Sequence, residues 1–521
     1  MKTRLLLLTP PFVQTNTPYP ATMHLTGFLR ENGCAVEQRD LSIKVVRDIL
    51  LAHGDETTEE LLELLSGPAP AEAKLAASAV IDELALAIRD EIDPSFGFSR
   101  YAERISASAA DFGVIERLVK RRGVIDRPLE RHLEAAIEET RPTVIGVTCP
   151  FPGTLVAAFK IARYVKRRHP GIRLVLGGGF VSTELREMTD KRPYRYFDEF
   201  QFDEGYESLL RLCGKRLARP VPAFVRPDYD GIDLGEYFDV VETANPMHRL
   251  WSVGRWVKLV MSRGCYWHRC AFCDVKLPYI AACEVPDPNE IVDAMEGFSA
   301  TSGSSAFHFV DEAMPPKLVE GVAREILRRR LKCIWWGNVR FDLGFTPQLV
   351  KLMAKAGCVA VTGGLECAND RLLKLMNKGI TLASAKRVLA RFRSAGILVH
   401  GYLMYGFPTE TEAEAFGALD FVRGLFREGL LTSAFWHRFA LTVHSPIAAS
   451  PGRFGIEVVR PRQRRVFCRN ELAYREAGAP DWGRIGKVLE LALYNYQEGR
   501  GLGKSMRYWR RAGGSRAAAE D

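Results

Sequence analysis

Residues 261–274 read Met261-Ser-Arg-Gly-Cys-Tyr-Trp-His-Arg-Cys-Ala-Phe-Cys-Asp and carry the strongest chemical signal in the chain. The stretch follows an apolar run over 257–261 that predicts a buried strand, and it holds three cysteines, Cys265, Cys270 and Cys273. Three thiolates on one short loop suit a soft metal centre, either zinc or an iron–sulfur cluster. A zinc site needs a fourth ligand, for which His268 and Asp274 are the candidates within the loop.

Downstream of the cysteines, strands alternate with helices. Apolar runs typical of strands recur at barrel-like spacing over 257–450, at 257–261, 306–311, 332–337, 358–363, 397–404 and 434–442. Helical patterns separate these runs, as in consecutive βα units. The six units predict a partial (β/α)6 barrel, opened relative to the closed form of eight units.

The cysteine loop and the motifs after it resemble the radical S-adenosylmethionine (SAM) enzymes. That family places three cysteines, spaced Cys-x3-Cys-x2-Cys, at the carboxyl end of the first barrel strand, whereas the first gap here is one residue longer. Three later stretches resemble family segments in the family's order: Phe307-His-Phe-Val-Asp-Glu, Val361-Thr-Gly-Gly-Leu-Glu and Gly401-Tyr-Leu-Met-Tyr-Gly-Phe-Pro. The resemblance extends over about residues 255–450.

This resemblance implies a role for each matching residue. Cys265, Cys270 and Cys273 would hold a 4Fe-4S cluster whose open iron binds the amino and carboxylate groups of SAM. Electron transfer to the sulfonium would then yield a 5′-deoxyadenosyl radical. The residues expected near SAM are Asp311 and Glu312 at the methionine amine, Glu366 at the ribose, and Gly401, Gly406 and Pro408 along the adenine.

Four more polar residues lie near the ends of predicted barrel strands. Asn338 and Arg340 follow the third strand and are candidates to face the cofactor or the substrate. His437 and His444 lie near the last strand and are candidates for substrate binding or acid–base chemistry. The alternative is a structural role, because histidines beside strands are commonly hydrogen-bonded within the fold and aromatic pairs at strand ends, such as Trp335 and Trp336, commonly belong to the core.

Residues 1–215 predict a doubly wound, flavodoxin-like α/β sheet. A strand over 4–8, a helix over 22–32 and a strand over 36–41 open a parallel sheet, which resumes at 144–148. Between these parts, residues 43–140 are rich in Ala, Leu and Glu at helical spacing, which predicts a helical insertion.

This part of the chain resembles the cobalamin-binding domain that precedes the barrel in one large radical SAM subfamily. The matching segments are Thr9-Pro-Pro-Phe, Asn16-Thr-Pro-Tyr-Pro-Ala, the strand at Val144 and Leu176-Gly-Gly-Gly-Phe-Val. Ligands of such sheets bind beyond the carboxyl ends of strands. The expected cobalamin residues are therefore Thr9, Pro10, Thr148, Gly177, Gly178 and Gly179. The Asp-x-His-x-x-Gly motif of other cobalamin proteins is missing. The alternative is a sheet that has lost its ligand and serves as a docking module.

The remaining segments are predicted to connect and extend these two domains. Residues 216–256 contain several prolines and turn-forming residues and are interpreted as a linker. Residues 451–521 are predicted to be helical and basic, ending in an Ala/Gly/Arg segment expected to be disordered.

Composition is that of a multidomain globular enzyme. The chain has 521 residues, a formal net charge of +9, 47% hydrophobic and 26% charged residues, which excludes a disordered or membrane-bundle protein. No run approaches the ~18 apolar residues of a membrane span, and no long basic stripe suggests nucleic acid. Eleven cysteines are too few for a disulfide scaffold, so a reducing, cytoplasmic setting is expected.

The sequence favours a radical SAM enzyme with cobalamin that methylates an unactivated carbon of an unknown organic substrate. It would use a one-electron donor such as a flavodoxin or ferredoxin. One alternative is a radical rearrangement, cyclisation or oxidation without methyl transfer. A different class of function is a metal-stabilised cobalamin-binding protein without catalysis.

Overall fold

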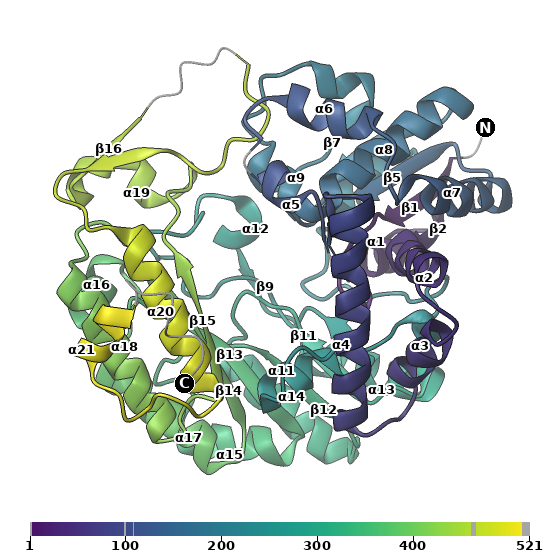
Figure 1. Cartoon of the computed structure of the whole chain (residues 1–521). Helices are drawn as coiled ribbons and strands as arrows, with labels where there is room; N and C mark the ends of the chain where they lie inside the picture. Colours follow the sequence, from purple (N-terminus) through teal and green to yellow (C-terminus); the bar gives the residue numbers. More distant parts are fainter. Residues whose placement is uncertain (1–2, 98–99, 108, 460–464, 513–521) are drawn as a thin grey trace. The chain divides into compact units, whose positions relative to one another are not determined.

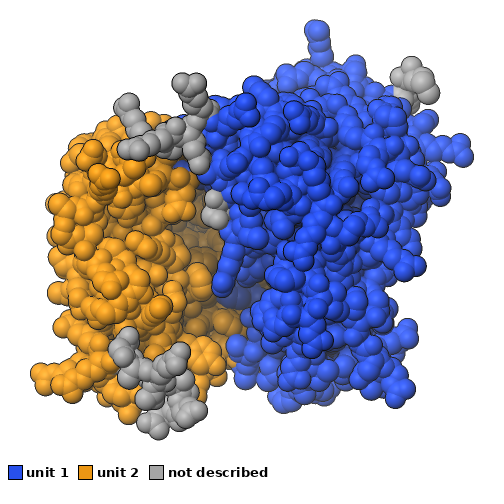
Figure 2. All heavy atoms as spheres, turned by 45° about the horizontal axis from the view of Figure 1, so that its top comes forward, with its two compact units in different colours: residues 1–244, 251–259, 462–470 blue, residues 245–250, 260–461, 471–521 orange. Residues whose placement is uncertain are grey.

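The computed structural model describes residues 3–97, 100–107, 109–459 and 465–512, and it divides into two compact units (Figures 1 and 2). Unit 1 comprises residues 1–244, 251–259 and 462–470, and unit 2 comprises residues 245–250, 260–461 and 471–521. Within the described part of the chain, every helix is too short or too polar to cross a lipid bilayer.

Unit 1 is built on a parallel five-stranded sheet. Its strands, in spatial order, are β2 (Ala35–Asp40), β1 (Arg4–Thr9), β5 (Val144–Thr148), β6 (Arg173–Gly177) and β7 (Glu199–Phe200). Apolar side chains alternate between the two faces of β1, because successive residues of a strand point to opposite sides. Leu5 and Leu7 pack with helices α1 (Ala21–Glu31) and α10 (Tyr206–Leu212). Leu6 and Leu8 pack on the other face with α2 (Leu41–His53), α7 (Asp126–Thr140) and α8 (Pro152–Arg168). The sheet is therefore doubly wound, as predicted.

The segment between β2 and β5 is mainly helical. It contains α2 (Leu41–His53), α3 (Thr58–Ser66), α4 (Ala71–Ala87), a π-helix (Ile88–Ile92), α5 (Glu103–Ala107), α6 (Phe112–Lys120) and α7 (Asp126–Thr140). A small antiparallel pair, β3 (Phe96–Gly97) and β4 (Arg100–Tyr101), interrupts the helices. After β5 come α8 (Pro152–Arg168), α9 (Gly179–Glu184) and a 3-10 turn (Arg192–Arg195).

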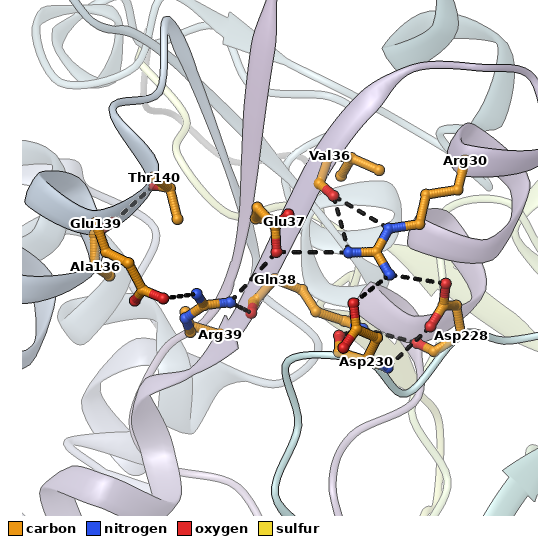
Figure 3. A network of polar contacts seen from close by, with 10 residues as sticks. All are labelled: Arg30, Val36, Glu37, Gln38, Arg39, Ala136, Glu139, Thr140, Asp228 and Asp230. Carbon is orange, nitrogen blue, oxygen red and sulfur yellow. Dashed lines mark hydrogen bonds and ion pairs between the residues drawn. The ribbon is translucent and has the colours of Figure 1, made fainter. Parts of the chain in front are cut away.

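The segment interpreted as a linker packs largely as part of unit 1, which contains residues 216–244. It buries Phe224, Tyr237 and Phe238, so its apolar side chains belong to the core despite the many prolines. Figure 3 shows the polar side of this packing. Arg30 of α1 donates to Asp228 and Asp230 over 2.9 Å each. These contacts fix the segment along the edge strand β2.

Unit 2 contains most of a six-stranded sheet with the order β15-β14-β13-β12-β11-β8. Its strands are β8 (Val257–Leu259), β11 (Ala306–Phe309), β12 (Ile334–Asn338), β13 (Cys358–Glu366), β14 (Leu398–Tyr405) and β15 (Ser433–Arg438). The registered pairs from β11 to β15 are parallel and follow chain order. The connecting helices are α13 (Pro288–Ser302), α14 (Pro316–Arg329), α15 (Pro347–Lys355), α16 (Asp370–Leu375), α17 (Leu382–Ser394) and α18 (Glu412–Arg427). This is the predicted partial barrel of six βα units.

The carboxyl-terminal region differs from the expected continuous helical segment. Strands β16 (Ile456–Val458) and β17 (Tyr474–Glu476) form an antiparallel pair before α20 (Trp482–Gln497) and α21 (Met506–Ala512). Residues 462–470 belong to unit 1. Among the described residues, the helical prediction from about residue 457 is therefore wrong at 457–458 and 474–476, where β16 and β17 pair with each other. The expected disordered segment lies in residues 513–521, outside the described residues.

Candidate functional site

The three predicted metal ligands lie on the loop that follows β9 (Arg263–Gly264), at the carboxyl edge of the barrel sheet. Cys270 is buried, and Cys265 and Cys273 are partly buried. Between them, Ala271 packs into a core cluster at this edge, and its N–H donates to Met376 O over 2.8 Å. Ala271 thus anchors the loop to the core, and the thiols of Cys270 and Cys273 lie on either side of this anchor.

Cys270 has the environment of a thiolate. A hydrogen bond from Cys273 lowers the pKa of Cys270 to about 6, against the effect of burial, and the positive charges of Lys378 and Arg340 act in the same direction. Among the described residues, no three Cys, His, Asp or Glu side chains converge closely enough to hold a single ion. Three cysteines on one loop suit a 4Fe-4S cluster, in which each cysteine binds a different iron.

The long first gap of the cysteine loop is supported by a turn at residues 377–379. Trp267 Nε1 donates to Asn377 O over 2.8 Å, and Asn377 Nδ2 donates to Arg269 O over 3.0 Å. His268 adopts a left-handed backbone conformation with φ +33°. A side chain on Gly379 would overlap the indole of Trp267. The four-residue gap between Cys265 and Cys270 therefore stays attached to the barrel through these contacts with residues 377–379.

Arg340, predicted to face cofactor or substrate, lies against this loop. Its guanidinium is 4.6 Å from the centroid of the Trp267 ring, and its Nη2 donates to Lys378 O. Tyr266 beside it donates a hydrogen bond of 2.6 Å to Asp342. Arg340 is buried, and its contacts make it a support of the cysteine loop that brings positive charge to the thiols.

Glu366 forms a buried ion pair at the end of β13. Lys378 Nζ is 2.6 Å from Glu366 Oε1. Burial lowers the pKa of Lys378, but the Glu366 and Cys270 charges outweigh it, so that the pKa is raised. A side chain on Gly364 would overlap Glu366 Oε1, which makes glycine a requirement of this pair. The pair also lies within electrostatic range of His437.

Asp311 is engaged in positioning the start of the cysteine loop. Its carboxylate accepts hydrogen bonds from Met261 N (2.8 Å), Ser262 N (2.6 Å) and Ser262 Oγ (2.9 Å). Burial nevertheless raises the pKa of Asp311 to about 6. Asn338 Nδ2 donates to Asp311 O over 2.7 Å, and its Oδ1 accepts from Thr362. Glu312 is exposed beside these residues.

The turn that follows β14 holds a buried acid, Glu410, that sequence reasoning missed. Glu410 Oε2 accepts hydrogen bonds from Gly406 N over 2.7 Å and Phe407 N over 3.1 Å. Burial raises the pKa of Glu410 to about 8. Pro408 is buried in the turn between them, whereas Gly401 lies against Leu431 and Leu365. The available signal was an acid two residues after Gly406-Phe-Pro.

The two candidate histidines have different surroundings. His437 lies on β15, and burial lowers its pKa, so that the imidazole is neutral at pH 7. His444 follows β15 in a turn, and its Nε2 is buried with no hydrogen-bond partner in the described part of the protein. Only His437 is associated with the Glu366–Lys378 pair.

A second candidate site lies at the carboxyl edge of the unit 1 sheet. Thr9, Thr148 and Gly177 end the adjacent strands β1, β5 and β6, and Pro10 is buried directly after β1. Thr148 Oγ1 is buried and has no hydrogen-bond partner among the described residues. Because buried polar groups normally have a hydrogen-bond partner, this hydroxyl is suited to bond with a polar group of a ligand at the sheet edge.

The glycines after β6 are explained partly by the chain itself. Gly178 has φ +109°, and a Cβ there would lie 2.7 Å from both Cys149 N and Cys149 O. Gly179 begins α9 and is exposed. The close approach that Gly178 permits is therefore to the backbone after β5.

Comparisons with known proteins agree with this architecture. The model of the radical SAM superfamily matches residues 259–422. An anaerobic magnesium-protoporphyrin IX monomethyl ester cyclase from Cereibacter sphaeroides is 26% identical over 307 residues, or 54% of this chain and 49% of the relative. The chain thus spans about half the length of this curated relative.

Two solved structures share the fold across most of the chain. The radical SAM methyltransferase TsrM from Kitasatospora setae, with cobalamin and a [4Fe-4S] cluster bound, has a TM-score of 0.52 and 17% identity, covering 89% of this chain and 82% of TsrM. The cobalamin-dependent radical SAM enzyme OxsB, with aqua-cobalamin bound, has a TM-score of 0.55 and 13% identity, covering 94% of this chain and 66% of OxsB. The predicted fold class, a doubly wound sheet followed by a partial barrel, is confirmed.

Proposed function

We propose that this chain is a cobalamin-dependent radical SAM enzyme that methylates an unactivated carbon of an organic substrate, and the match of residues 259–422 to the radical SAM superfamily supports this. The observation that carries the proposal is the three-cysteine loop at the carboxyl edge of a parallel barrel sheet, with Lys378 and Arg340 beside Cys270. TsrM, which has this fold, binds cobalamin, and OxsB, which has the same fold, is a cobalamin-dependent enzyme, and both observations support the cobalamin part of the proposal.

Cys265, Cys270 and Cys273 are the proposed ligands of a 4Fe-4S cluster. When bound, the cluster supplies an electron to SAM, and cobalamin carries the methyl group. The charges of Lys378 and Arg340 favour the thiolate form of Cys270, which is the form that binds iron. Asp311 fixes the backbone at Met261 and Ser262, so the loop starts from a defined position.

Several polar groups around the cysteine loop are proposed to bind SAM. Glu312 is exposed next to Asp311 and can accept a hydrogen bond from the methionine amine. Glu366 is proposed at the ribose, held in orientation by Lys378. The segment from Gly401 to Pro408 is proposed to lie along the adenine, with its final turn fixed by Glu410.

Cobalamin is proposed to bind at the carboxyl edge of the unit 1 sheet. Thr148 Oγ1 can hydrogen-bond a polar group of the ligand, because it has no partner in the described protein. Thr9, Pro10 and Gly177–Gly179 complete this edge. The Asp-x-His-x-x-Gly motif is missing, so we propose that the cobalt lacks the histidine ligand that this motif supplies in other cobalamin proteins.

His437 and His444 are proposed to face the substrate. A neutral imidazole at His437 can accept a proton, and His444 Nε2 lacks a partner in the described part of the protein, so it is suited to bind a polar group. Asn338 is already bonded through both amide atoms and is proposed to position Asp311. The electron donor is proposed to be a flavodoxin or ferredoxin, in the cytoplasm.

A second candidate is radical cyclisation, rearrangement or oxidation without methyl transfer. The name of the Cereibacter relative, a cyclase, favours this alternative. Product mass distinguishes the two, because methylation adds one CH2 unit. A cobalamin-binding protein without catalysis is the third candidate, and it predicts zinc in place of iron and sulfide.

The test is anaerobic reconstitution with iron, sulfide and hydroxocobalamin, followed by reduction, addition of SAM and quantification of 5′-deoxyadenosine. We expect product from the wild type and from Cys468→Ala, which replaces a partly buried cysteine of unit 1. The triple variant Cys265→Ala/Cys270→Ala/Cys273→Ala should bind neither iron nor sulfide. Full iron content in the triple variant would overturn the cluster assignment.

A further inference from the structure

A fourth cysteine joins the three of the cysteine loop in space. Cys283 lies ten residues after Cys273, and its spacing in the sequence matches no metal motif. In the structure it begins β10 (Cys283–Glu284), which pairs antiparallel with β9. The register places Cys283 directly opposite Gly264, the residue before Cys265. The chain thus leaves β9, forms the cysteine loop and returns with Cys283 at the base of that loop.

The hairpin that holds Cys283 is closely fixed. Cys265 N donates to Ile280 O over 3.3 Å. Gly264 has φ +79°, and a side chain there would overlap Ala282 O, so the two strands approach as closely as backbone allows. Arg263 and Glu284 form an ion pair across the same strands. These contacts hold the backbone on both sides of Cys265 and Cys283.

Cys283 lies close enough to the cluster site to be influenced by two of its charged groups. It is partly buried and lies within electrostatic range of both the Cys265 thiol and the Asp311 carboxyl. Cys265 itself forms a parallel bridge with Ala313, two residues beyond Asp311. Cys283 therefore borders the region between a proposed cluster ligand and the end of β11, where SAM is proposed to bind.

The other cysteines of unit 2 are placed differently. Cys333 and Cys358 lie at the amino ends of β12 and β13, and their thiols are directed to Ala356 O and Ala360 O. Cys367 donates to Glu410. Among the described cysteines, Cys283 is the one that the fold adds to the three-cysteine loop.

We propose that Cys283 is a fourth thiolate ligand of the cluster in the resting protein and that SAM replaces it. The inference rests on the proposed 4Fe-4S cluster. On binding iron, the Cys283 thiol gives its proton to solvent. When the amine and carboxylate of SAM bind, the thiolate leaves the iron and takes up a proton again, so no electron moves. The fourth thiolate would protect the iron that three cysteines leave open.

The experiment uses the full chain reconstituted anaerobically, as wild type, Cys283→Ala, Cys283→Ser and the control Cys333→Ala. Each is treated with ferricyanide without SAM, and the iron-to-sulfide ratio and the electron paramagnetic resonance of a three-iron cluster are measured. We expect wild type and Cys333→Ala to keep four irons, while both Cys283 variants lose one. SAM, titrated spectroscopically, should bind the Cys283 variants more tightly, because no thiolate competes.

Equal loss of the fourth iron from wild type and both Cys283 variants would overturn the inference while leaving the proposed function intact. The serine variant keeps the size of the side chain, so it separates loss of the thiol from a packing defect at β10. If none of the proteins bound iron and sulfide, the cluster assignment itself would fail, and this inference with it.

Discussion

Gly379 lies directly against the indole of Trp267. A side chain on Gly379 would overlap this ring, and its φ of +75° is in the left-handed region that favours glycine. Trp267 belongs to the widened first gap of the cysteine loop and is hydrogen-bonded to Asn377 O. The turn at 377–379 therefore determines how this loop is seated on the barrel.

Gly379→Ala should displace Trp267 and reduce iron incorporation. Gly396→Ala is a matched control, because Gly396 has φ +74° but no atom within 4 Å of an added Cβ. The control carries only the backbone strain of about 1 kcal/mol. We expect Gly379→Ala to cost about 1–3 kcal/mol more, the usual range for overpacking. Iron per chain and urea unfolding measure both effects, and equal iron content in the two variants would contradict the role of the turn.

Glu366→Gln alone should destabilise the barrel more than the double variant that removes the charges of both Glu366 and Lys378. The variant leaves the buried Lys378 ammonium without its partner at 2.6 Å, which costs about 3–5 kcal/mol for buried pairs. The double variant Glu366→Gln/Lys378→Met removes the charge as well and should recover most of that loss. Urea unfolding of Glu366→Gln, Lys378→Met and the double variant gives the coupling energy. A double variant no more stable than Glu366→Gln would show that the pair is not energetically coupled.

Glu410 should make stability fall as pH rises. Its ordinary pKa is 4.5, and burial raises it to about 8 in the folded protein. Between these values the folded protein holds a proton that the unfolded chain has released, so a rise in pH favours unfolding. Glu410→Gln cannot titrate but keeps an acceptor for Gly406 N and Phe407 N. The variant should match wild type near pH 5 and exceed it near pH 8 in urea unfolding; parallel pH profiles would refute this.

The sequence predicted the elements whose signal is local. Apolar runs located the strands of both sheets, and the Ala/Leu/Glu pattern located the helices between β2 and β5. The short strands β16 and β17 were missed, since three-residue strands that pair across 15 intervening residues have no local pattern. The packing of residues 216–244 was likewise missed, because the apolar groups around Phe224 and Tyr237 are short and stand among prolines and turn residues.

The candidate site could be predicted as a set of residues but not as a set of contacts. The spacing of the three cysteines placed them on one loop, as observed. It did not indicate that Asp311 bonds to Met261 and Ser262, that Arg340 supports Trp267, or that Gly178 accommodates Cys149. These are contacts between residues far apart in the sequence, and only the fold brings them together.

Thr148→Val should stabilise the ligand-free protein but weaken the stabilisation that added cobalamin provides. The substitution removes a buried hydroxyl that lacks a partner in the described protein, so the ligand-free variant should be more stable by about 1 kcal/mol. Thr154→Val is the matched control, because Thr154 Oγ1 donates to Phe151 O over 2.8 Å and its loss should destabilise. If Thr148 contacts cobalamin, added hydroxocobalamin should raise the melting temperature of Thr148→Val less than that of wild type and Thr154→Val. Equal ligand-induced shifts in all three proteins would place the cobalamin away from Thr148.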